Sequence, residues 1–142
     1  MTHRVINTVI YMEQEDRLQD AVLNQIKEAG IEVISVSDLF HANLDFYLHQ
    51  PEVALFAVGV EDENMIGFDF VVKLVRADAL KPSEVALISG DFEVEALAVA
   101  HEFHFFDKGD GGFVEEMIGV AQENAIAKRK GSRVSASVSV TA

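Results

Sequence analysis

The stretch PEVALFAVGVEDENMIG, residues 51–67, contains the apolar run that decides the fold. Residues 53–60 are almost all apolar, Pro51 precedes them and three consecutive acids follow at 61–63. A short, continuous apolar run between such boundaries is typical of a strand that is buried on both faces. Strands of this kind occur in parallel sheets that are covered by helices on both sides.

Further apolar runs recur along the chain, with helical patterns between them. We predict strands at 5–11, 31–37, 53–60, 85–90 and 103–106. The first helix shows the expected periodicity, since Leu18, Val22 and Ile26 lie four residues apart and Gly30 supplies a stop signal. Alternating strands and helices of this kind predict a single doubly wound α/β domain.

The remaining helices have start signals of their own. Asp38 is expected to cap a helix over 39–49, and Asp91 is expected to cap another that follows the fourth strand. A third helix is predicted over 65–80, and the last one begins near Val114.

The chain of 142 residues is long enough for one domain, which we place at 1–128. We expect residues 129–142 to form a disordered tail, because the segment is small, polar and without helical periodicity. The alternation of RVSASVSV at 133–140 leaves open that this tail pairs as a strand.

Composition excludes several classes of function. The chain has no cysteine, which removes disulfides, thiolate metal sites and cysteine nucleophiles. Its 24 acidic and 11 basic residues give a net charge of −13, which disfavours binding to nucleic acid. No signal peptide is visible, and no apolar run approaches the roughly 18 residues of a membrane helix. We therefore expect a cytoplasmic protein with no membrane contact.

Polar side chains are predicted at the carboxyl ends of several strands, where open α/β sheets bind their ligands. Glu13 follows the first strand, Ser89 ends the fourth, and Lys108 follows the fifth. These groups are expected to meet at one edge of the sheet.

With these residues placed, the chain resembles a bacterial response-regulator receiver domain of the CheY-like superfamily, over residues 4–127. The resemblance implies a flavodoxin-like five-stranded parallel sheet in the order 2-1-3-4-5, with helices on both faces. Glu13 and Gln14 match the acidic pair of such domains. Ser89 and Lys108 match their hydroxyl and lysine positions, and Phe105 matches the aromatic switch position.

The phosphoacceptor aspartate of receivers has no counterpart here. Depending on the register, its position is taken by Ala57 or by Gly59. Phosphoryl transfer to a receiver needs a carboxylate oxygen as nucleophile, and neither residue has one. Asp62 is the candidate for a relocated acceptor, although acids at 61–63 also suit the start of a helix.

The loss of carboxylates affects the metal and the lysine as well. Magnesium is usually held by one or two carboxylates together with phosphate, and Gln14 is neutral. We expect no tight magnesium site and no other cofactor. Lys108 is expected to find a new partner, either Glu13 or Asp107.

These residues favour a degenerate receiver, or pseudo-receiver, without enzymatic activity. It would act in bacterial signal transduction, independently of phosphorylation, by binding a histidine kinase or another signalling protein. The resemblance places the contact on the face formed by the fourth helix, the fifth strand and the fifth helix, where a homodimer is also compatible. One alternative is a sensor that binds a small anion through Lys108 and Ser89. The other is a true receiver that is phosphorylated on Asp62.

Overall fold

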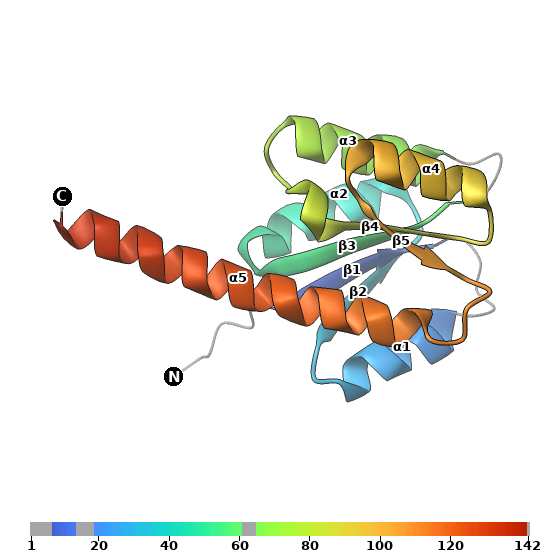
Figure 1. The fold of residues 1–142 in the computed structure, drawn as a ribbon, viewed down its shortest axis with the longest axis horizontal. Coiled ribbons are helices and arrows are strands. Elements are labelled where there is room, and N and C mark those ends of the chain that lie inside the picture. The colour runs from blue at the N-terminus through green and yellow to red at the C-terminus, as the bar shows by residue number, and fades with distance from the viewer. Residues whose placement is uncertain (1–6, 14–18, 61–64, 142) are drawn as a thin grey trace.

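A computed structural model of the chain describes residues 7–13, 19–60 and 65–141, with side chains described as far as Arg129 except those of Gln19 and Pro51. Five strands and five longer helices alternate along it (Figure 1). The strands are β1 (Thr8–Met12), β2 (Glu32–Val36), β3 (Val53–Gly59), β4 (Val85–Ser89) and β5 (His104–Asp107). The helices are α1 (Gln19–Glu28), α2 (Leu39–His49), α3 (Ile66–Arg76), α4 (Phe92–His101) and α5 (Phe113–Thr141).

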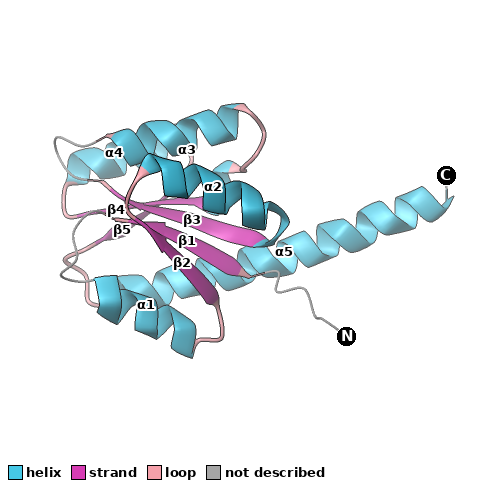
Figure 2. Cartoon of the chain, turned by 180° about the vertical axis from the view of Figure 1, so that it is seen from behind, coloured by secondary structure: helices cyan, strands magenta, loops and turns pink. Residues whose placement is uncertain are grey.

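The strands form one parallel sheet in the order β2-β1-β3-β4-β5, which confirms the predicted fold class. In Figures 1 and 2, helices α2, α3 and α4 lie on one face of the sheet, while α1 and α5 lie on the other. The central strand β3 is buried from Val53 to Val58, as its apolar run requires. The register pairs Tyr11 with Ala57 and Met12 with Val58, so β1 and β3 end side by side.

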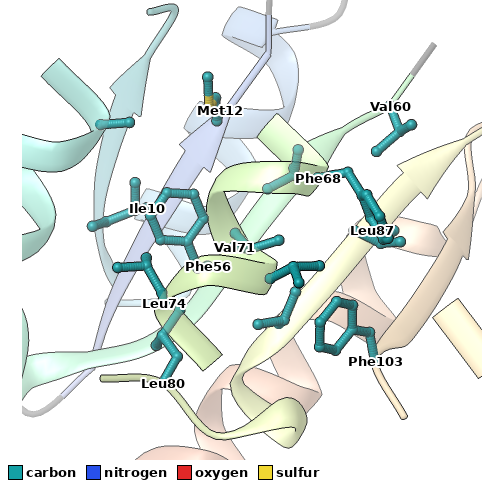
Figure 3. Packing of buried hydrophobic residues seen from close by; sticks show 14 of the residues in the cluster. Ile10, Met12, Phe56, Val60, Phe68, Val71, Leu74, Leu80, Leu87 and Phe103 are labelled. Carbon is teal, nitrogen blue, oxygen red and sulfur yellow. The ribbon is translucent and has the colours of Figure 1, made fainter. Parts of the chain in front are cut away.

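Each face of the sheet has its own apolar core. On the side of α2, α3 and α4, Phe56 lies in a cluster with Ile10, Val71 and Leu87 (Figure 3). The opposite cluster contains Tyr11 and Ala57 together with side chains of α1 and α5. Alternate residues of β1 and β3 thus serve alternate cores, because successive side chains of a strand point to opposite faces.

The predicted helix boundaries are confirmed where a specific local signal supports them. The Asp38 carboxylate accepts a hydrogen bond from the backbone N–H of His41 at 2.8 Å, and Asp91 accepts one from Glu93 at 2.9 Å. Gly30 ends the first helical segment with a φ of +82°. These contacts satisfy backbone groups that a helix end would otherwise leave unpaired.

Helix α3 is shorter than predicted, since it ends at Arg76 and not at residue 80. Asp78 adopts a φ of +57°, and the N–H of Ala79 donates to the carbonyl of Leu74 at 2.9 Å. A left-handed residue after the last turn closes a helix, and aspartate tolerates this conformation better than most residues. At the other end of α3, Gly67 lies in the first turn, where an added Cβ would come within 2.5 Å of Val58 Cγ1.

Helix α5 extends to Thr141, whereas the sequence predicts a disordered tail over 129–142. Extending an existing helix needs no new nucleation, so small polar residues can continue one that they would not start. In Figure 1 this second half of α5 projects beyond the sheet. The part of α5 that packs on the sheet is fixed by Lys128, which forms an ion pair with the buried Glu84 at 2.8 Å.

Candidate functional site

The candidate site lies at the carboxyl edge of the sheet, one residue beyond the ends of β1 and β5. Glu13 follows β1, and its backbone N–H donates to the carbonyl of Val36 at 3.2 Å. Lys108 follows β5, and its N–H donates to the carbonyl of Ser89 at 3.1 Å. These bonds extend the sheet by one residue at each strand, which fixes the direction of both side chains.

The Glu13 carboxylate is the centre of the site. It is 4% exposed, and each of its oxygens accepts a hydrogen bond. Lys108 Nζ lies 2.6 Å from Oε1, and the Tyr11 hydroxyl donates to Oε2 at 2.7 Å. The Lys108 side chain is itself largely buried. Glu13 is therefore the new partner of Lys108, as one of the two predicted possibilities had it.

Gly59 provides the space for this carboxylate. A Cβ built on Gly59 would lie 2.6 Å from Glu13 Oε1 and 2.8 Å from its Cδ. Its backbone φ is not positive, so local conformation does not demand glycine. The Glu13 carboxyl group thus occupies the volume that a side chain at position 59 would enter. The Glu13 carboxylate can take its observed position because residue 59 has no side chain.

The same geometry separates the two possible acceptor positions. Ala57 is completely buried in the core on the α1 and α5 side, in register with Tyr11 and Ala86. Gly59 lies at the edge of the sheet, beside Glu13. Gly59 is therefore the position that lies against Glu13, the partner of Lys108, and Ala57 is a core residue.

Ser89 contributes a hydrogen bond at the start of α4, and Phe105 contributes to the packing of the core. The Ser89 side chain is buried, and its Oγ accepts a hydrogen bond from the N–H of Asp91 at 3.1 Å, at the start of α4. Phe105 is partly buried against the core beneath α2, α3 and α4, in register with Leu87. Gln14 and Asp62, the other predicted site residues, lie outside the described residues.

Tyr11 is a site residue that the sequence analysis did not identify. It was counted only as part of a strand. The available signal was its spacing: residues two apart on a strand share a face, so Tyr11 points to the same side as Glu13. The pKa of the Tyr11 hydroxyl is raised far above its ordinary value, first by burial, then by the negative charge of Glu13 and by their hydrogen bond.

This pKa shift predicts a loss of stability in alkali. The folded chain keeps the Tyr11 proton above pH 10, while the unfolded chain releases it near its ordinary pKa of 10.0. The contribution of the Tyr11 proton to the free energy of unfolding is therefore complete below pH 10. It falls as the pH rises further, by up to about 1.4 kcal/mol per pH unit. Urea unfolding across this range should show a shallower decline for Tyr11→Phe than for wild type. Tyr47→Phe, at an exposed tyrosine, should decline like wild type, and equal slopes for all three would contradict the assignment.

Both oxygens of the Glu13 carboxylate are engaged, one by Lys108 Nζ and the other by the Tyr11 hydroxyl. Within 7–13, 19–60 and 65–141, no group of three or more His, Cys, Asp or Glu side chains is placed to hold a metal ion. In the same ranges, no helix combines the length and the apolar composition that crossing a membrane requires.

Neither protein-family models nor curated proteins match the chain. Solved structures do match it. Chemotaxis protein CheY4 of Vibrio cholerae is 17% identical, with a TM-score of 0.65 over 82% of this chain and 96% of that one. A response-regulator receiver domain protein from Clostridium thermocellum is 12% identical, with a TM-score of 0.67 over 86% and 96%. The chain has the fold of a receiver domain.

A third solved structure also matches the chain, and its description names a different kind of protein. A structure described as adenylate cyclase from Rhodopirellula baltica is 13% identical, with a TM-score of 0.69 over 90% of this chain and 96% of that one. Identities this low show a shared fold and leave function to the residues of the site. Glu13, Gly59 and Lys108 lie at the carboxyl edge of the sheet. The resemblance to receiver domains predicts the acceptor aspartate at this same edge.

Proposed function

We propose that the chain is a pseudo-receiver that works without phosphorylation, as a binding module for another signalling protein and not as an enzyme. The observation that carries this proposal is the position of the Glu13 carboxylate, against Gly59 and 2.6 Å from Lys108 Nζ. A receiver that accepts phosphate needs a carboxylate nucleophile at this strand end and a lysine available to the new charge. Here glycine stands at the strand end, and a built-in carboxylate already engages the lysine.

The outer face of α4 supports the binding part of the proposal. Phe92 is 81% exposed and Val99 is 72% exposed, and Ala96 between them is exposed as well. They follow one another at helical spacing and form an apolar stripe on the solvent side of the helix. An exposed apolar surface of this kind is typical of a contact with another protein.

The phenylalanines in and just before β5 are turned towards the cores and not towards solvent. Phe103 and Phe106 are both buried, and Phe105 is partly buried. Phe103 and Phe105 belong to the core beneath α4, whereas Phe106 belongs to the core on the side of α1 and α5. On α4, by contrast, Phe92 offers an exposed aromatic side chain to a partner.

One experiment tests both parts of the proposal. The purified chain, immobilised with and without prior treatment by acetyl phosphate and magnesium, is used to retain proteins from a native lysate. We expect no added phosphate in the intact mass and the same retained protein in both cases. Phe92→Asp should lose that protein, because it places a charge in the apolar contact. The matched control Gln25→Asp adds a charge to an exposed position on α1, across the sheet, and should keep it.

Two results would contradict the proposal in different ways. Added phosphate that disappears in Asp62→Asn would establish a relocated acceptor. Retention that Phe92→Asp and Gln25→Asp reduce equally would remove the α4 face as the binding surface. A histidine kinase among the retained proteins would connect the chain to a two-component pathway.

A further inference from the structure

The outer face of α2 carries an exposed apolar ridge. Phe40 is 72% exposed, Leu44 46%, Tyr47 53% and Leu48 67%. The opposite side of the same helix buries Ala42 and Phe46 in the core. A surface helix ordinarily has a polar outer face, so α2 has an apolar surface that the fold itself does not use.

The shape of the ridge suits a second copy of itself. Phe40, Leu44 and Leu48 are spaced by four residues and form a single row along the helix, and Tyr47 lies beside it. Rows of this spacing pack into one another in the commonest class of helix contact, at a crossing angle of about −50°. A two-fold axis beside Leu44 would bring each Leu44 against its equivalent and Phe40 against Leu48 of the second copy.

Charge also favours a second copy over a charged partner. Each chain carries −13, so two copies can meet only through a surface with few acids. Helix α2 contains a single acidic residue, the half-buried Asp45, and no Glu, Lys or Arg. At its start, the Asp38 carboxylate is paired with His41 at 2.7 Å. The four side chains of the ridge carry no charge for a basic or acidic partner to recognise, and two ridges that meet bring few acids together.

The available area is sufficient for a weak dimer. The exposed parts of the four ridge side chains and Leu39 amount to about 500 Å² per copy, given the size of aromatic side chains. Two copies would bury about 1,000 Å², near the lower bound for a specific interface. From the ridge, its symmetry and its charge, we infer that the chain forms a two-fold homodimer through α2. The dimer depends on neither the Glu13 site nor the α4 face.

Cysteine cross-linking tests the geometry directly, because the chain contains no cysteine. In Leu44→Cys, the two introduced thiols would face each other across the axis. Mild oxidation should convert this variant to a disulfide-linked dimer of twice 15.6 kDa. The control Val99→Cys, at an exposed position on α4, should cross-link more slowly. Cross-linking of Leu44→Cys that is no faster than that of Val99→Cys would overturn the α2 dimer.

Sedimentation of the full chain tests the association itself. The wild-type mass should rise with concentration from 15.6 kDa towards twice that value. Leu44→Asp should raise the dimer dissociation constant by at least about tenfold, and Val99→Asp should leave it unchanged. Circular dichroism would verify that both exposed substitutions keep the fold. A wild-type chain that stays monomeric into the millimolar range, or an equal effect of both substitutions, would overturn the inference.

Discussion

Lys108→Met is expected to lower the free energy of unfolding by about 3 kcal/mol at neutral pH. The substitution preserves much of the side-chain length and removes the positive charge that lies 2.6 Å from Glu13 Oε1. The Glu13 carboxylate, 4% exposed, then keeps its bond from Tyr11 but has lost its ion-pair partner. Urea unfolding monitored by circular dichroism would measure the loss as a lower midpoint at an unchanged slope.

The double variant Glu13→Gln/Lys108→Met is the control for this result. Its glutamine retains an acceptor for the Tyr11 hydroxyl and removes the unpaired charge. We expect it to lose only about 1 kcal/mol relative to wild type, because breaking one partner of a buried pair costs more than replacing both. If the single and double variants unfold at the same urea concentration, then the pair of Glu13 and Lys108 does not stabilise this edge of the sheet.

Gly59→Asp, which places a carboxylate at the end of β3, is expected to destabilise the fold by about 3 kcal/mol. Its Cβ would lie 2.6 Å from Glu13 Oε1, so Glu13 must leave its place. Two carboxylates would then compete for the ammonium group of Lys108. Gly90→Asp is the matched control, because a Cβ at Gly90 meets nothing within 4 Å. That control should change the stability by less than about 1 kcal/mol.

Removing the competing side chain should reverse the effect. In Gly59→Asp/Glu13→Ala, the new carboxylate can take the position that Glu13 has left and pair with Lys108. We expect this double variant to regain most of the stability that Gly59→Asp loses. Losses that simply add in the double variant would show that Glu13 and position 59 do not share one space.

Under the proposal that the chain is a pseudo-receiver, the contact between Glu13 and Gly59 accounts for how its site would differ from that of a phosphate-accepting receiver. The lysine at the end of β5 still has a carboxylate partner, but that partner comes from the end of β1 and reaches over Gly59. An aspartate that accepts a phosphoryl group needs a carboxylate oxygen that is available to attack the donor. Both oxygens of the buried Glu13 are engaged, so this carboxylate has a structural role instead. Its loss should lower the free energy of unfolding.

The sequence predicted those features that depend on neighbouring residues. The buried run of β3, the stop at Gly30 and the caps at Asp38 and Asp91 all follow from local chemistry and are confirmed. The end of α3 was placed too late, because the left-handed turn at Asp78 has no strong signal in sequence. The continuation of α5 past Lys128 also differs from expectation, because low helical periodicity does not prevent a formed helix from extending.

The site was predictable only in part. Its pocket residues could be proposed from strand ends and from the resemblance, but Glu13 and Asp107 remained equal candidates for the partner of Lys108. Tyr11 was missed altogether, because a tyrosine in a buried strand is usually a core residue whose hydroxyl finds some partner. The apolar ridge on α2 was missed for a related reason, since one helix with two apolar sides gives no clear indication of which side faces the sheet.

By itself, then, the sequence determined that this chain forms a doubly wound sheet and that Ala57, Val58 and Gly59, at the end of the third strand, have no carboxylate. Both follow from the identity and local order of residues. Only the tertiary structure decided which carboxylate pairs with Lys108. Glu13, Gly59 and Lys108 are 46 and 49 residues apart along the chain. Their contact depends on the register of parallel strands and on a volume left empty by glycine, and neither is a local property of the sequence.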